Sequence, residues 1–193
     1  ILWLGWFGFN GGSVLSADPA LTSLTLVTTC LAAAAGGIAC ALTAKGVYGT
    51  LDITMFMNGV LGGLVGITAG ADQMSPAEAI AIGAIAGPIV LGGVALLDKA
   101  KLDDPVGAIP VHLFCGIWGT LAVGIFGGLA SGTQIAIQAA VLGVAGIFCC
   151  VGAVIIVLLV KALVGLRVSE AEEAEGLDIA EHGTGAYADF SIK

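Results

Sequence analysis

Long apolar segments with few charged residues alternate with short polar connections along most of this chain. The segments lie at about residues 1–16, 20–44, 53–71, 79–97, 105–127 and 133–164. Because a helix rises 1.5 Å per residue, about 20 apolar residues cross the roughly 30 Å hydrocarbon core of a bilayer. The pattern therefore predicts an all-α polytopic membrane protein, with its transmembrane helices in residues 1–164 and a tail over 165–193.

Proline and glycine mark the expected helix ends. Pro19, Pro76 and Pro105 precede apolar segments, and each is predicted to lie in the first turn of a helix, where a missing amide costs nothing. The apolar stretch from Pro105 to Val160 is too long for one helix. The sequence "GGLASGT" at 127–133 predicts the break, since glycine and serine at that density favour a turn.

Acidic residues precede several of the predicted helices. Asp52 comes before the segment at 53–71, and Asp103 and Asp104 come before Pro105. Carboxylates in these positions cap free amides and interact favourably with the positive end of the helix dipole, so we interpret them as N-caps.

Basic residues define the expected sidedness. If the segments alternate in direction, one side of the membrane receives Lys45, Lys99, Lys101, Lys161 and Arg167, while the opposite connections contain no Lys or Arg. The positive-inside rule places that side in the cytoplasm, together with the tail. We therefore expect a multi-pass protein of the plasma membrane whose C-terminal tail is cytoplasmic.

The composition supports a membrane protein and argues against other classes. Hydrophobic residues make up 58% of the chain and charged residues 10%, against about a quarter charged in soluble domains. Half of the acidic residues, seven of fourteen, follow Val168, so most of the net charge of −8 belongs to the tail. The five cysteines lie in apolar segments without a CxxC pair and are interpreted as small hydrophobes. We predict no metal, no cofactor, no enzymatic activity and no nucleic-acid partner.

Glycines recur at four-residue spacing in three of the segments. The pairs are Gly59 and Gly63, Gly83 and Gly87, and Gly124 and Gly128. Small residues at this spacing allow helix backbones to approach closely in lipid, where packing drives association. All three pairs are predicted to form helix contact faces.

His112 is the one histidine within an apolar segment, whereas His182 lies in the polar tail. An ionisable side chain inside a membrane is costly unless it is paired or lines a cavity. A neutral imidazole accepts a proton on one nitrogen and donates from the other, which suits a proton or ammonia relay. The alternative is an imidazole bonded to a backbone carbonyl. Pro110, two residues earlier, is expected to free carbonyls near that depth and so favours a cavity.

The segment "GWFGFNGGS" at 5–13 contains three aromatics and an Asn among four glycines. Trp6 and Phe9 are three residues apart and therefore share a helical face. Two interpretations remain open. The aromatics can be interfacial belt residues, or their rings can attract a small cation while the hydroxyl of Ser13 accepts a hydrogen bond from it.

Taken together, these motifs resemble the ammonium transporter (Amt) family. The resemblance lies in "GWFGFNGGS", "NGVLGGLVGITAG", "DDPVGAIPVHLFCGIWGTLAVGIF" and the tail "VGLRVSEAEEAEGLDIAEHGTGAY", which occur in the expected order. It implies the inverted-repeat ammonium-transporter fold, of which these residues are the second half. The chain also begins inside an apolar segment at Ile1, and we expect it to be the C-terminal portion of a longer protein.

The resemblance also implies roles for particular residues. Phe9 would belong to a phenylalanine gate, Ser13 would contribute to an outer ammonium site, and Trp6 would line the pore. His112 would be the second of two pore histidines. The implied assembly is a homotrimer with a pore in each subunit. The tail would communicate with a PII-type signalling protein, and the tail residues expected to contact the membrane domain are Arg167, Gly176, Asp178 and Tyr187.

The function that the resemblance implies is transport of ammonium or ammonia, with methylammonium as an analogue. Ammonium would lose its proton on leaving the outer site, and neutral ammonia would cross along the imidazoles, because a bare cation in hydrocarbon is costly. The alternatives are an ammonium sensor, an Rh-type ammonia or CO2 channel, and a purely structural membrane subunit. An unstructured acidic tail is the alternative for residues 165–193.

Overall fold

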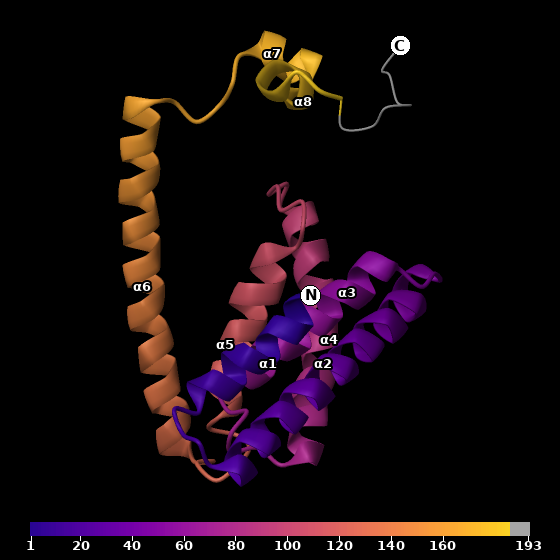
Figure 1. Cartoon of the computed structure of the whole chain (residues 1–193), viewed down its shortest axis with the longest axis vertical. Coiled ribbons are helices and arrows are strands. Elements are labelled where there is room, and N and C mark those ends of the chain that lie inside the picture. The colour runs from indigo at the N-terminus through magenta and orange to yellow at the C-terminus, as the bar shows by residue number, and fades with distance from the viewer. Residues whose placement is uncertain (186–193) are drawn as a thin grey trace. The chain divides into compact units, whose positions relative to one another are not determined.

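The computed structural model describes residues 1–185, and all regular secondary structure in that range is helical (Figure 1). This confirms the all-α prediction. The chain divides into two compact units, Ile1–Val144 and Ala145–Lys193, with the boundary inside α6. The elements are α1 (Leu2–Ser13), α2 (Pro19–Tyr48), α3 (Ile53–Thr68), α4 (Pro76–Lys99), η1 (Ile109–Phe114), α5 (Cys115–Ala122), α6 (Gly132–Leu163), α7 (Glu170–Glu175) and α8 (Leu177–His182).

Side-chain caps begin three of the long helices in the first unit. The carboxylate of Asp18 accepts an amide N–H of α2 at 2.8 Å, and that of Asp52 accepts two from α3 at 2.7 and 3.0 Å. Ser75 and the carboxylate three residues later form a reciprocal capping box at the start of α4. Pro19 and Pro76 lie in first turns, as predicted.

The prediction that a helix begins at Pro105 is wrong. Pro105 lies in a turn, and the next helical segment, η1, begins at Ile109. The reason is Gly107, whose φ of +74° is left-handed and interrupts any right-handed helix at that point. Asp104 still acts as a cap, because its carboxylate accepts two amides at the start of η1, each at 2.8 Å. Within residues 1–185, Asp103 makes no such bond.

Helices α2, α3 and α4 pack through small residues. A Cβ atom added at either Gly63 or Gly83 would overlap the carbonyl oxygen of Ala32 on α2. An addition at Gly59 would collide with the Cβ of Cys40 and the carbonyl oxygen of Gly36, and one at Gly87 with the backbone of the same two residues. The predicted contact faces on α3 and α4 are therefore confirmed, and α2 is the helix that both faces meet.

The third glycine pair behaves differently. A Cβ at Gly124 would lie 2.5 Å from the side chain of Ile135, so this position is also crowded. At Gly128 nothing lies within 4 Å in the described chain, so a contact at this position, including the contact between subunits that such faces can make, stays a prediction. Helix α5 ends at Ala122, so both glycines lie in the turns that follow it and do not share a helical face.

Buried polar side chains add directional bonds between these helices. Thr28 on α2 is fully buried, and its hydroxyl donates to the carbonyl oxygen of Ala71 at 2.6 Å. At the start of α4, Glu78 accepts the backbone amide of Ser75 at 2.8 Å and that of Gly127 at 3.1 Å. Glu78 therefore joins the beginning of α4 to the turn after α5.

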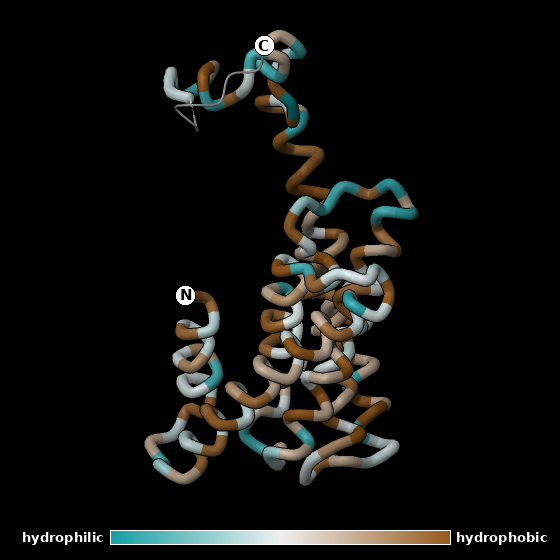
Figure 2. Tube along the Cα trace, turned by 90° about the vertical axis from the view of Figure 1, so that its right-hand side faces the viewer, coloured by the Kyte–Doolittle hydropathy of each residue, from teal (hydrophilic) through white to brown (hydrophobic). Residues whose placement is uncertain are grey.

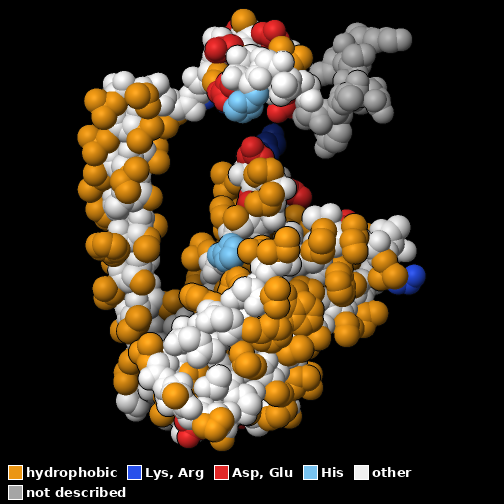
Figure 3. All heavy atoms as spheres, viewed as in Figure 1, with side chains coloured by type: hydrophobic (Ala, Val, Ile, Leu, Met, Phe, Trp, Pro, Cys, Tyr) orange, Lys and Arg blue, Asp and Glu red, His pale blue; other side chains and the backbone are white. Residues whose placement is uncertain are grey.

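Three helices of the described chain are long and apolar enough to cross a membrane: α2, α4 and α6. The shorter apolar segments are α3 and the continuous run Ile109–Ala122. Hydrophilic positions gather in the connections between helices (Figure 2), and hydrophobic side chains cover most of the visible surface of both α6 and the bundle (Figure 3). These features define a helical membrane protein.

The second unit contains the end of α6 and the two short tail helices. Ser169 caps α7 in another capping box with Glu172. Hydrogen bonds from the hydroxyl and then the amide of Ser169 hold the pKa of Glu172 below its usual value. Gly176, at φ +97°, separates α7 from α8, and Gly183, at φ +66°, ends α8. Both glycines adopt a backbone conformation that other residues rarely take.

Candidate functional site

Helix α1 presents Trp6 and Phe9 to each other. Their ring centroids lie 5.6 Å apart at an interplanar angle of 74°, an edge-to-face contact. The indole Nε1 of Trp6 donates to the hydroxyl of Thr68 on α3 at 2.9 Å, which fixes the ring orientation. Phe9 remains 58% exposed. One face of α1 therefore holds an oriented indole beside an accessible phenyl ring.

Ser13 lies one turn further along the same helix, exposed, and its hydroxyl donates to the carbonyl oxygen of Phe9 at 2.6 Å. Because that bond uses the hydroxyl hydrogen, the oxygen retains its lone pairs as acceptors. Such an oxygen can accept an N–H from a cation. The aromatic pair and this acceptor therefore lie on neighbouring turns of α1.

Asn10 is a residue of this motif that the sequence analysis did not single out. It is 3% exposed, and its Nδ2 donates to the hydroxyl of Thr29 on α2 at 2.9 Å. Its Oδ1 is buried without a partner in the described chain. The sequence signal that could have identified Asn10 is its polar amide side chain within a segment of glycines and aromatic residues. The Asn10 and Trp6 bonds attach α1 to α2 and α3.

His112 lies on η1, in the wide π-helical turns that precede α5. Its side chain is exposed and makes no hydrogen bond within residues 1–185. The prediction that Pro110 frees backbone carbonyls is wrong. This proline lies in the first turn of η1, where its missing amide would have had no helical partner. π-turns are rare and occur frequently at functional sites.

The structure does not bring His112 into contact with α1. Helix α1 and η1 each pack against α3 and not against each other. The pore residues predicted from the sequence therefore fall into two groups, one of Trp6, Phe9 and Ser13 on α1 and one of His112 on η1, with α3 contacting both elements.

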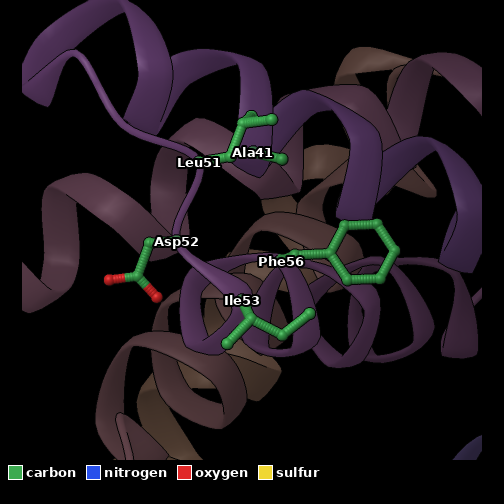
Figure 4. Close-up of a pocket in the computed structure, with 5 residues that line it drawn as sticks. All are labelled: Ala41, Leu51, Asp52, Ile53 and Phe56. Atoms are coloured by element: carbon green, nitrogen blue, oxygen red, sulfur yellow. The ribbon is translucent and has the colours of Figure 1, made fainter.

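A shallow pocket of about 310 Å³ lies elsewhere, where α2 and α3 meet near the connection between them (Figure 4). Its lining is apolar except for Asp52, whose carboxylate is already used to cap α3. None of the residues predicted for the pore lines it. The lining residues are Ala41, Leu51, Asp52, Ile53 and Phe56.

The described part of the chain contains no group of three or more His, Cys, Asp or Glu side chains that could hold a metal ion. Cys40 and Cys115 are buried in the contact between α2, α4 and α5, while Cys30, Cys149 and Cys150 are exposed on apolar helices. All five are free thiols.

The predicted tail residues can be placed only within the second unit. Arg167 forms an ion pair with Glu173, with its Nε at 2.9 Å from Glu173 Oε1, and so attaches α7 to the segment before it. Gly176 is the left-handed residue between the tail helices, and Asp178 lies in the first turn of α8. Tyr187 lies outside the described residues. Contact between these residues and the membrane domain stays a prediction.

Comparison with known proteins gives this helical membrane protein a family. The sequence profile of the Ammonium Transporter Family matches residues 1–187. The chain is 41% identical to ammonium transporter Amt2 of Archaeoglobus fulgidus, covering 98% of this chain and 44% of that one. A Synechocystis protein described as an ammonium transporter, sll1017, is 46% identical over 95% of this chain and 42% of its own length.

Solved structures agree. The "Sensor Amt Protein" superposes with a TM-score of 0.86 at 35% identity, covering 93% of this chain and 46% of that chain. Mep2 of Candida albicans gives a TM-score of 0.82 at 26% identity, over 89% and 42%. The chain belongs to the ammonium transporter family. It spans about half the length of the relatives it matches.

Proposed function

We propose that this chain forms the second half of an ammonium transporter, in which residues 1–164 are the membrane region and 165–193 a cytoplasmic tail. Family membership supports the substrate, ammonium or ammonia, with methylammonium as an analogue. The observation that carries the proposal is the exposed face of α1, where the paired rings of Trp6 and Phe9 lie one turn from the free acceptor of Ser13.

The outer site would use two kinds of attraction. Ammonium is a small cation, and the faces of aromatic rings attract cations most strongly where water is excluded. The hydroxyl oxygen of Ser13 can accept one of its N–H groups, since the hydroxyl hydrogen is engaged with Phe9. In this proposal Phe9, the more exposed ring, acts as the gate and Trp6 lines the path beyond it.

His112 would act deeper along the path. Carrying a charged ammonium ion across hydrocarbon is far more costly than carrying neutral ammonia. The exposed imidazole, free of other hydrogen bonds in the described chain, can accept from or donate to a passing ammonia molecule. The proposed transporter therefore separates the proton from ammonia after the outer site.

The assembly and regulation belong to the same proposal. We propose a homotrimer in the plasma membrane, in which Arg167, Gly176, Asp178 and Tyr187 of the tail contact the membrane domain and the tail communicates with a PII-type signalling protein. The Arg167–Glu173 ion pair, the capping box of α7 and the second short helix, α8, support an ordered tail over residues 167–182 rather than an unstructured one.

The test measures ammonium-evoked current and methylammonium uptake by the full-length protein in liposomes. In the His112→Ala variant we expect flux to fall about tenfold or more, the effect of losing one hydrogen-bond partner in the path. His182→Ala removes the other histidine, which lies in the tail, and should keep flux within about twofold. Unchanged selective flux in His112→Ala would overturn the relay.

A second candidate function is ammonium sensing, favoured by the similarity to the structure named "Sensor Amt Protein". A sensor binds substrate and signals with little net transport. Equilibrium binding of methylammonium without measurable uptake, together with a response that is lost when residues 168–193 are deleted, would favour the sensor over the transporter.

A further inference from the structure

The placement of His112 depends on the backbone that carries it. No hydrogen bond from another described side chain holds the imidazole, and η1 is short and π-helical. In a helix, a shift of one residue moves a side chain by about 1.5 Å along the axis and turns it by roughly 100°. Whatever fixes the start of η1 therefore determines where the imidazole points.

The start of η1 is built around a tight turn. The backbone amide of Gly107 donates to the carbonyl oxygen of Asp104 at 3.2 Å, and the left-handed φ of Gly107 reverses the chain. The carboxylate of Asp104 then accepts the first two amides of the helical segment. These bonds are local, so they define the shape of the turn but not its position against the other helices.

One side chain from another helix holds this turn in place. Asn58 on α3, which is 8% exposed, donates from Nδ2 to the carbonyl oxygen of Val106 at 3.1 Å. The contact is close, because a Cβ atom added at Gly107 would lie 2.9 Å from the same nitrogen. Asn58 therefore binds the peptide group between Val106 and Gly107 through a hydrogen bond and a close contact.

The contacts on the α4 side are of a different kind. Gly93 leaves room for Pro110 and Phe114, and a Cβ added there would lie 2.8 Å from each of their side chains. These apolar contacts determine how close η1 lies to α4. Apolar contacts are not directional, so they do not by themselves prevent η1 from rotating or sliding along α4. The amide of Asn58 supplies that direction.

We propose that Asn58 is a positioning residue for His112: its bond to Val106 holds the beginning of η1 in register on α3, and so holds the imidazole in the path of the substrate. The inference rests on the proposed function. It predicts that Asn58 affects the transport step while leaving the outer ammonium site on α1 unchanged.

The first experiment replaces Asn58 in the full-length protein, reconstituted in liposomes. Asn58→Leu fills a similar volume but removes the donor, and should lower the maximal ammonium flux about tenfold while the half-saturating concentration stays within about twofold. Asn58→Gln keeps a donor and should retain more flux than the Leu variant. If Asn58→Leu does not assemble, Asn58→Ala carries the same comparison.

Thr28→Val is the matched control. It also removes a buried side-chain bond to a backbone carbonyl across two elements, but on α2, away from η1. Its flux per folded molecule should stay near that of the parent protein. Equal losses of flux in Thr28→Val and Asn58→Leu would show that Asn58 contributes only stability, and would overturn the inference.

A double-mutant comparison identifies the route of action. If Asn58 acts through His112, adding Asn58→Leu to His112→Ala should cause almost no further loss. An undiminished further loss would overturn the inference. Normal flux in Asn58→Leu with impaired flux in His112→Ala would remove this inference alone, whereas normal flux in His112→Ala would remove the proposed relay itself.

Discussion

Helices α2 and α6 are similar in length and apolar character but differ in packing. Helix α2 has 30 residues and α6 has 32, and both can cross a membrane. The buried positions of α2 are Thr25, Thr28, Thr29, Ala32, Ala33, Gly36, Gly37, Cys40 and Ala44, whereas α6 has none. The buried side of α2 thus consists entirely of small residues.

The difference shows that hydropathy and packing are separate signals. A run of apolar residues indicates the bilayer and is present in both helices, with a mean hydropathy of 1.8 in α2 and 2.9 in α6. The contact partner is indicated by glycines that face another backbone, as Gly36 does toward Gly59 and Gly63. On α6, additions at Gly143, Gly146 and Gly152 would meet nothing within 4 Å in the described chain. Within each unit, therefore, a glycine marks a packing face only where another backbone or side chain meets it.

The largest expected effect on stability comes from adding a methyl group to a glycine that faces another helix, compared with one that faces no neighbour in the described chain. Gly63→Ala forces a Cβ into the carbonyl of Ala32 and should destabilise the protein by about 3 kcal/mol, as overpacking does. Gly146→Ala meets no neighbour and should be neutral or stabilise α6 by up to about 1 kcal/mol. Thermal unfolding in detergent measures both. Destabilisation by Gly146→Ala would reveal a close partner for α6 in the full-length protein.

A smaller effect is expected from a buried hydroxyl in the packed region. Thr28→Val keeps the shape of the side chain but leaves the carbonyl oxygen of Ala71 without its donor, which should cost about 1–2 kcal/mol. Thr133→Val changes an exposed threonine near the start of α6 and should be close to neutral. Equal midpoints for the two variants would contradict the role of this bond between α2 and the turn after α3.

The smallest effect is expected in the tail, where the capping box of α7 is exposed. Because the pKa of Glu172 is lowered in the folded tail, its contribution is present above the usual value of 4.5 and is lost as the pH falls through the lower folded value. Amide hydrogen exchange over residues 169–175 should therefore accelerate at low pH relative to the intrinsic rate. Glu172→Gln should not show this change, and identical pH profiles would contradict it.

Much of the fold can be predicted from local signals. Pro19 and Pro76 mark helix starts because their lack of an amide is harmless in a first turn. Pro105 has the same local pattern, with acidic residues before it, yet the helix begins four residues later. The left-handed conformation of Gly107 accounts for the error, since a lone glycine in sequence does not reveal its φ.

The candidate site was only partly accessible from sequence. The motif around Trp6 and the one histidine within an apolar segment are visible as residue types, and their assignment to a pore stays a prediction. Asn10 and Asn58 were not, because each amide matters through a distant partner, Thr29 on α2 for Asn10 and Val106 in the turn before η1 for Asn58. Bonds between residues 19 and 48 positions apart carry no local pattern.

The bond between Glu78 and Gly127 also constrains how the chain threads the bilayer. A carboxylate and an amide 3.1 Å apart lie at the same level along the bundle, so the beginning of α4 and the turn after α5 lie at the same end of it. Helix α4 and the run η1–α5 are therefore antiparallel. If α4 crosses the membrane, the run η1–α5 is expected to lead the chain back toward the side from which α4 starts, and this expectation does not depend on where the lysines lie.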